Sequence, residues 1–73
     1  MTSALRELLA EQSIPVWVAW LAQDSDGVWW GYEVEPLENH RGWYENEVGQ
    51  YVRLGVTPVE GAWRQAIYRY PFQ

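Results

Sequence analysis

The chain has 73 residues, 48% of them hydrophobic and 16% aromatic, which is the length of one domain and too apolar for a disordered protein. Its formal net charge of −5, from ten acidic residues against five arginines, disfavours direct binding to nucleic acid, because phosphate contacts need clustered positive charge. The same charge favours a protein partner with a basic surface. Because there is no cysteine, disulfides and cysteine-based zinc sites are excluded.

The sequence also lacks the usual signals of export and membrane insertion. Its N-terminal residues show no basic region followed by an apolar run, as a signal peptide would. The apolar stretches all fall short of the roughly 18 residues needed to span a membrane. We therefore expect a single domain over residues 1–73 that is cytoplasmic in its host cell and makes no contact with a membrane.

Residues 1–12 have the pattern of a short amphipathic helix. Thr2 or Ser3 can cap its first turn, and Pro15 disfavours helix at the residue before it. One face of this helix carries Leu5, Leu8 and Leu9. A helix of about ten residues is marginal alone, so these leucines are expected to dock on a sheet.

Residues 16–35 predict a β-hairpin at the centre of that sheet. The segments 16–22 and 28–35 are rich in Val, Trp and Tyr, which suit a pleated and partly buried surface. Between them, the run Asp24-Ser25-Asp26-Gly27 has the side chains of a tight turn. A two-residue loop at 25–26 or at 26–27 would place the same side chains on the same face of the hairpin.

Pairing with a two-residue loop gives the hairpin two different faces. One face is wholly apolar and is expected to be the core; it carries Trp17, Ala19, Leu21, Val28, Trp30, Tyr32 and Val34. The other face mixes apolar and acidic side chains; it carries Val16, Val18, Trp20, Ala22, Trp29, Gly31, Glu33 and Glu35. A slip of one residue would exchange the partners and break up the apolar face.

The middle of the chain predicts a long loop and then a third strand. Residues 36–50 are irregular, with at most one short strand or turn, and Trp43 is the expected tether of this loop. Residues 50–56 alternate as a strand does, with Val52, Leu54 and Val56 toward the core. Tyr51 and Arg53 then share the mixed face with the acidic side chains.

Residues 57–70 are compatible with two structures. Thr57, Pro58 and Glu60 make a capping box that favours a short C-terminal helix. Gly61 opposes a helix by about 1 kcal/mol, and a strand over roughly 63–70 is the alternative. The expected fold is α+β: an N-terminal helix packed on a three- to four-stranded antiparallel sheet, with a short C-terminal helix.

No residue pattern in the chain points to catalysis. The single histidine, His40, has no nucleophile or carboxylate placed against it by sequence spacing. The carboxylates of the middle segment, Glu33, Glu35, Glu38, Glu45 and Glu47, do not follow the spacing of a calcium loop. Phosphate-binding and nucleophile-elbow motifs are missing too. We therefore expect no catalytic residue, no metal and no cofactor, and a protein that is not an enzyme.

The high content of aromatic side chains is the one sequence feature that points to a function. A chain this short has a thin core that cannot easily hide all six tryptophans. Either a helix covers each face of the sheet, or some of these side chains form an exposed patch that binds a partner. The expected partner-binding residues are Trp20, Trp29, Tyr51 and Arg53, then Trp43 and Tyr44, with Glu33 and Glu35 at the rim.

The order of these residues is similar to that in small uncharacterised proteins of bacteriophages and prophages. It reads WVAxxxxDxDGxWWxYExxP, then GWYxxxxGQYVxLG, then TPxxxxWRQAIYRY; the matching residues are 17–19, 24–30, 42–44, 49–55 and 58–68. The resemblance covers most of the chain and consists of aromatics and turns. Several proteins of this kind, anti-CRISPR proteins among them, act by binding and blocking a host protein.

The resemblance implies a phage-type accessory protein that inhibits a host protein stoichiometrically. Its target would be a CRISPR component or another nucleic-acid-binding defence protein, whose basic groove suits an acidic inhibitor. Two alternatives remain open. One is a homodimeric structural protein that uses the aromatic patch on itself, and the other is a small carbohydrate-binding module with tryptophan platforms.

Overall fold

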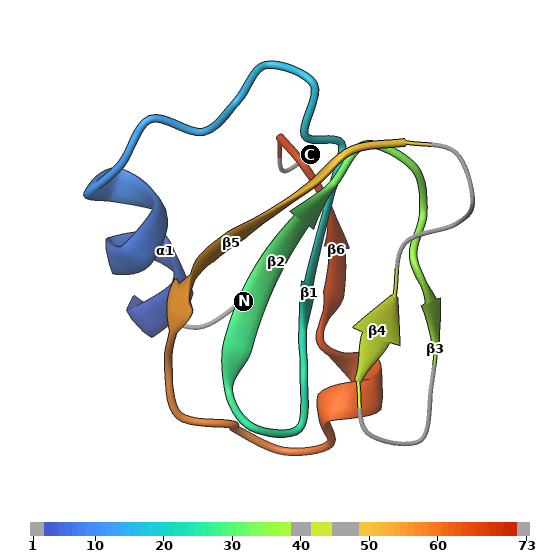
Figure 1. The fold of residues 1–73 in the computed structure, drawn as a ribbon. Coiled ribbons are helices and arrows are strands. Elements are labelled where there is room, and N and C mark those ends of the chain that lie inside the picture. Colours follow the sequence, from blue (N-terminus) through green and yellow to red (C-terminus); the bar gives the residue numbers. More distant parts are fainter. Residues whose placement is uncertain (1–2, 39–41, 45–48, 72–73) are drawn as a thin grey trace.

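The computed structural model describes residues 3–38, 42–44 and 49–71 (Figure 1). Within them the elements are α1 (Ser3–Ala10), β1 (Trp20–Gln23), β2 (Val28–Tyr32), β3 (Leu37–Glu38), β4 (Trp43–Tyr44), β5 (Tyr51–Val56), a 3-10 turn (Trp63–Gln65) and β6 (Ile67–Arg69). Four of these strands make an antiparallel sheet in the order β5-β2-β1-β6, and β3 pairs with β4. The predicted α+β fold is confirmed, and the C-terminal segment contains the 3-10 turn.

The central hairpin forms as predicted, but its loop has three residues instead of two. The amide of Asp24 donates to the carbonyl of Val28 at 2.9 Å, and the amide of Gly27 donates to the carbonyl of Asp24 at 3.0 Å. Gly27 has a φ of +95°, which a glycine adopts without steric cost. A turn followed by a residue with positive φ is a common three-residue hairpin loop.

The longer loop shifts the pairing by one residue, so the predicted apolar face is wrong. Trp20 lies opposite Tyr32, and Ala22 lies opposite Trp30. Since neighbours across antiparallel strands share a face, Trp30 and Tyr32 belong with Trp20 and not with Leu21. Side chains alternate along a strand, so Leu21 and Trp29 lie on the opposite face of the sheet.

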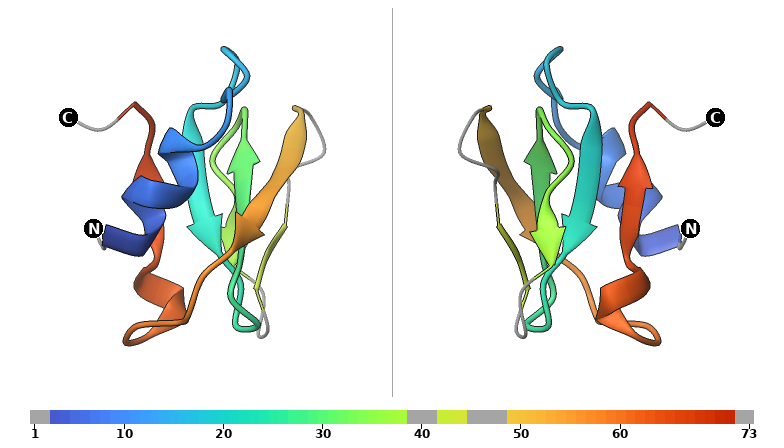
Figure 2. Two further views of the ribbon diagram at one scale, coloured as in Figure 1. Left: turned by 90° about the vertical axis from the view of Figure 1, so that its left-hand side faces the viewer. Right: turned by 90° about the vertical axis from the view of Figure 1, so that its right-hand side faces the viewer.

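Helix α1 covers the face that carries Leu21 and Trp29, and β3 and β4 lie on the other side of the sheet (Figure 2). The buried cluster of that core is Leu5, Val18, Leu21, Trp29 and Leu54, with Leu8 and Leu9 packed against it. The predicted docking of the helix through its leucines is therefore confirmed. Gln12 fastens the end of the helix to β5, because its Nε2 donates to the carbonyls of Leu8 at 3.1 Å and Leu54 at 2.9 Å.

Strand β5 is the predicted third strand, with one irregularity. Trp30 pairs with Arg53 and Trp29 pairs with Gly55, so Leu54 is an extra residue in β5. Such a bulge reverses the alternation beyond it. Val56 is consequently 56% exposed, and the prediction that it faces the core is wrong.

The predicted loop over residues 36–50 contains the short pair β3 and β4, and Trp43 tethers it as expected. The Trp43 indole Nε1 donates to the carbonyl of Gln23 at 3.1 Å, and its amide donates to Asp24 Oδ1 at 2.8 Å. Its ring meets Trp63 edge to face, with centroids 6.2 Å apart. Strands β3 and β4 make a second layer on the face of the sheet opposite α1 (Figure 2), where Tyr32 is only 2% exposed.

No helix begins at Thr57, although its sequence suggests a cap. Its hydroxyl is buried and accepts hydrogen bonds from Trp29 Nε1 at 2.7 Å and Gln23 Nε2 at 3.1 Å. Gly61 has a φ of +81°, which is not helical. The chain then adds β6 to the open edge of β1, so residues 67–69 follow the strand that was the alternative.

Candidate functional site

The face of the sheet opposite α1 presents two rows of side chains across the four strands. The register aligns Arg69, Trp20, Tyr32 and Tyr51 in one row, and Ile67, Ala22, Trp30 and Arg53 in the next. We call Trp20, Trp30, Tyr32, Tyr51, Arg53 and Arg69 the aromatic face. Its members come from all four strands, so the tertiary fold assembles it.

Part of the aromatic face is open to solvent. Tyr51 is 51% exposed, and Trp20 and Trp30 are half-buried. The Arg69 guanidinium lies over the ring of Trp20, 5.1 Å from its centroid, as in a cation–π contact. The rings of Trp30 and Tyr51 meet at 56° with centroids 5.8 Å apart. These contacts hold large, flat side chains in place at the surface.

A small cavity opens where the aromatic face meets β4. Its volume is about 100 Å³, and its lining residues are Asp24, Trp30, Tyr32, Trp43 and Tyr51. We call it the aromatic cavity. Within the described part of the chain, four of its five lining side chains are aromatic, and the fifth is a carboxylate.

The Asp24 carboxylate is positioned by both neighbouring tryptophans. Oδ2 accepts a hydrogen bond from Trp30 Nε1 at 3.1 Å, and Oδ1 accepts the amide of Trp43 at 2.8 Å. Burial raises the pKa of Asp24 above its ordinary range, and the nearby Asp26 carboxylate adds to this rise. The hydrogen bonds from Trp43 and Trp30 act in the opposite direction.

We expect Asp24 to titrate above the ordinary aspartate range in carbon-detected NMR of the side-chain carboxyls. Asp26→Asn should move the midpoint down, because it removes a like charge and keeps the Oδ1 that accepts from the Val28 amide. With a raised folded-state pKa, Asp24 adds stability below its unfolded pKa and loses that contribution as pH rises through the folded pKa. A midpoint at or below the ordinary range would contradict the burial of this carboxyl.

The structure brings together three of the predicted partner-binding residues and separates a fourth. Trp20, Tyr51 and Arg53 share the aromatic face. Trp29 is 3% exposed in the core beneath α1, so its predicted place in an exposed patch is wrong. The cause is the one-residue shift of the hairpin, which exchanges Trp29 for Trp30 on the open face.

The remaining predicted residues lie around this face. Glu33 and Glu35 are exposed beyond the end of β2, and Glu33 Oε1 accepts the amide of Gln50 at 3.0 Å. Trp43 lines the aromatic cavity. The backbone of Tyr44 is in β4, but its side chain lies outside the described part of the chain, as do His40, Glu45 and Glu47.

The sequence prediction missed Trp30, Tyr32, Asp24 and Arg69 as members of this site. A two-residue hairpin loop predicts Trp30 and Tyr32 in the core, and the local sequence presents Asp24 as a turn residue. The favoured C-terminal helix includes Arg69, so only the alternative strand places it in the sheet. The one local signal was the run of two tryptophans at 29–30, since one of two adjacent strand residues must face away from the core.

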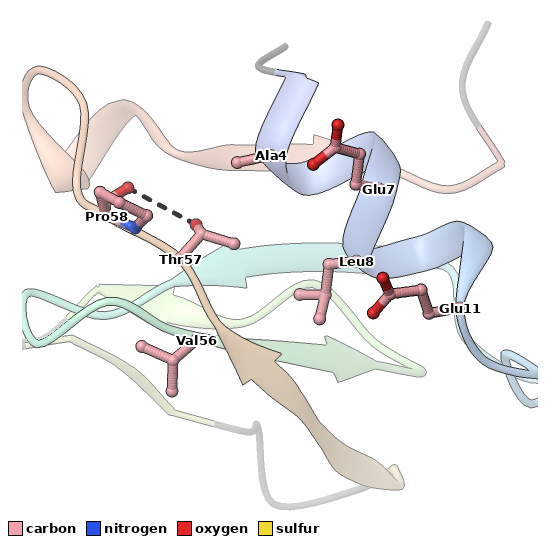
Figure 3. A pocket seen from close by; sticks show the side chains of 7 residues that line it. All are labelled: Ala4, Glu7, Leu8, Glu11, Val56, Thr57 and Pro58. Atoms are coloured by element: carbon pink, nitrogen blue, oxygen red, sulfur yellow. Dashed lines mark hydrogen bonds between the residues drawn. The ribbon is translucent and has the colours of Figure 1, made fainter.

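A second, larger cavity of about 260 Å³ lies between α1 and the end of β5 (Figure 3). It is lined by Ala4, Glu7, Leu8, Glu11, Val56, Thr57 and Pro58. Both glutamates are exposed; Glu7 belongs to α1 and Glu11 follows its last residue. The Thr57 hydroxyl donates within the wall to the carbonyl of Pro58 at 3.5 Å. The charged groups of this lining are the two glutamates, and no other described residue of the lining would select a particular ligand.

Among residues 3–38, 42–44 and 49–71, no group of three His, Cys, Asp or Glu side chains is arranged to hold a metal ion. Across the same part of the chain, the helix is too short and too polar to cross a membrane. Comparison of the chain with protein-family models, curated proteins and solved structures finds no match.

Proposed function

We propose that this protein is a small module that binds one partner protein stoichiometrically through the aromatic face. The supporting observation is the composition and exposure of that face: Trp20, Trp30 and Tyr51 are accessible beside Arg53 and Arg69. Trp, Tyr and Arg are the residue types that most often dominate the binding energy of protein interfaces.

The position of the face on a sheet supports the proposal. Trp20, Trp30 and Tyr51 belong to paired strands, and the opposite side of those strands packs on the core beneath α1. Side chains held in this way lose little freedom when a partner binds, so less of the interaction energy is spent on ordering them. A rigid face of this kind suits recognition better than a loop would.

The net charge indicates the chemistry of the partner. A chain with a charge of −5 attracts basic surfaces, and Glu33 and Glu35 are exposed near one edge of the aromatic face. Nucleic-acid-binding proteins have such surfaces. Together with the resemblance to small phage proteins, this favours an inhibitor that occupies a host protein of the CRISPR or other defence class.

Affinity capture from nuclease-treated lysate of a bacterial host, followed by mass spectrometry and titration of the purified partner, tests this proposal. We expect one stoichiometric partner whose affinity falls about 30-fold with Tyr51→Ala or Trp20→Ala, since a hot-spot side chain contributes about 2 kcal/mol. Val59→Ala is the matched control, because Val59 is an exposed apolar residue outside the sheet.

Equal binding by Tyr51→Ala, Trp20→Ala and Val59→Ala would rule out the aromatic face as the interface. Capture of the bait alone, with a mass that grows with concentration in light scattering, would favour self-association instead. Self-association is favoured by the position of β5, which is an edge strand with exposed Tyr51 and Val56.

A further inference from the structure

The lining of the aromatic cavity has an unusual composition for its size. Its walls are two indoles, Trp30 and Trp43, and two phenols, Tyr32 and Tyr51, and among the described residues the only other lining side chain is the Asp24 carboxylate. The faces of aromatic rings carry partial negative charge and attract cations, most strongly when the cation is desolvated. From this juxtaposition we propose that the aromatic cavity binds an alkylammonium group, supplied by a lysine side chain of the partner protein.

The rings are arranged as adjoining walls and not as a flat stack. Trp30 and Tyr51 meet at 56°, with their centroids 5.8 Å apart. Tyr32 is the strand neighbour of Tyr51 on the same face, and Trp43 enters from β4 on the second layer. A compact cation between such walls contacts more than one ring face, and each contact adds attraction.

Asp24 supplies the opposite charge that a partly desolvated cation needs. Its two oxygens accept from Trp30 Nε1 and from the Trp43 amide, which fixes the carboxylate against the cavity. A carboxylate has about four acceptor positions, so these two bonds leave room for an ammonium N–H. An anionic ligand would instead meet this carboxylate and the negative ring faces.

The aromatic cavity is large enough for the end of a side chain but too small for a whole small molecule. At about 100 Å³ it is well below the roughly 300–1,000 Å³ of pockets that enclose whole small molecules. Tyr51, half exposed at the edge of the cavity, leaves it open toward a partner on the aromatic face. Arg53 is a like charge across from Trp30, but it is exposed to solvent and does not line the cavity.

The test uses three probes and the full chain: choline, the N-acetyl amide of trimethyllysine, and 3,3-dimethylbutanol, which is a neutral isostere of choline. The indole N–H signals of Trp30 and Trp43 report on the cavity in ¹H–¹⁵N NMR spectra. We expect saturable shifts with both cations and much weaker ones with the neutral isostere. Tyr51→Ala and Asp24→Asn should each weaken choline binding about fivefold or more, a loss of about 1 kcal/mol in line with one cation–π contact.

Tyr51→Phe is the matched control, because it keeps the ring and should retain choline binding. Since Tyr51 is exposed, Tyr51→Ala tests the site even if Asp24→Asn perturbs the fold. Equal binding of choline and its neutral isostere would overturn the assignment of a cation site. So would an affinity for choline that neither variant changes, or no shift at high millimolar choline.

The proposal has two parts: the cavity binds a cation, and a lysine of the partner supplies it. Only the second part rests on the proposed binding function. The probes need no partner, so their failure leaves capture through Trp20 and Tyr51 untouched. Choline binding without any captured partner would retain the cavity as a cation site and refute the binding module. Once a partner is identified, replacing the lysine that enters the cavity by methionine should weaken binding as much as Tyr51→Ala does. If no single lysine-to-methionine substitution weakens binding, lysine is not the source of the ammonium group.

Discussion

Gly27→Ala is expected to lower the free energy of unfolding by about 3–4 kcal/mol, from positive-φ strain and forced displacement of packed backbone. Gly27 has a φ of +95°, and a Cβ at this position would lie 2.6 Å from the carbonyl oxygen of Thr57. That oxygen belongs to the backbone and cannot rotate away. A domain of this size has a total stability of about 4–11 kcal/mol, so the loss is about a quarter of that stability or more. Urea unfolding followed by tryptophan fluorescence measures the loss.

Gly61→Ala separates the two causes of this effect. Gly61 also has a positive φ, +81°, but a Cβ there has nothing within 4 Å. It should therefore show the conformational strain alone, about 1 kcal/mol. Equal losses for the two variants would show that the contact of Gly27 with Thr57 contributes nothing.

Gln23→Leu is expected to cost about 3 kcal/mol, because it removes a buried donor to the carbonyls of Thr57 and Gly27. The Gln23 amide is 3% exposed, and its Nε2 donates to the carbonyls of Gly27 at 3.1 Å and Thr57 at 3.0 Å. These bonds join the hairpin loop to the chain after β5. Gln65→Leu is the control of the same chemistry, since Gln65 is exposed, and it should change stability by less than about 0.5 kcal/mol.

Combining Gln23→Leu with Thr57→Val tests whether the buried bonds act as one network. The Thr57 hydroxyl accepts from Gln23 Nε2 at 3.1 Å and from Trp29 Nε1 at 2.7 Å. Because the two residues share a bond, the double variant should lose less than the two single variants together, by about 1 kcal/mol. Additive losses would mean that Gln23 and Thr57 stabilise the fold independently.

The central hairpin shows how far local sequence carries the prediction. The residues Asp24 to Gly27 predict the turn correctly, because local hydrogen bonding by Asp side chains and positive φ at Gly depend on those residues alone. The same four residues are compatible with a loop of two or three residues, and the difference reverses both faces. The contacts that accompany the longer loop come from far along the chain, through Thr57 N donating to Gly27 O at 3.1 Å and through Gln23.

The C-terminal segment shows the same limit. Thr57, Pro58 and Glu60 have the local chemistry of a helix start, and nothing nearby in sequence contradicts it apart from Gly61. In the structure the Thr57 hydroxyl bonds to Trp29 and Gln23, and the open edge of β1 pairs with β6. The backbone of Tyr70 then donates to Ala19 at 2.9 Å, beyond the end of both strands. Strand pairing and a buried hydroxyl outweighed the local preference.

The sequence by itself determined the fold class, the N-terminal helix with its docking leucines, the hairpin turn, the third strand and the tether at Trp43. Each of these follows from periodicity or from the chemistry of a few adjacent residues. The tertiary structure decided which tryptophan is buried and which is open, and it assembled the aromatic cavity from β2, β4, β5 and Asp24 at the end of β1. Those outcomes depend on register, and register is fixed by hydrogen bonds between residues more than thirty positions apart, such as Gln23 and Thr57.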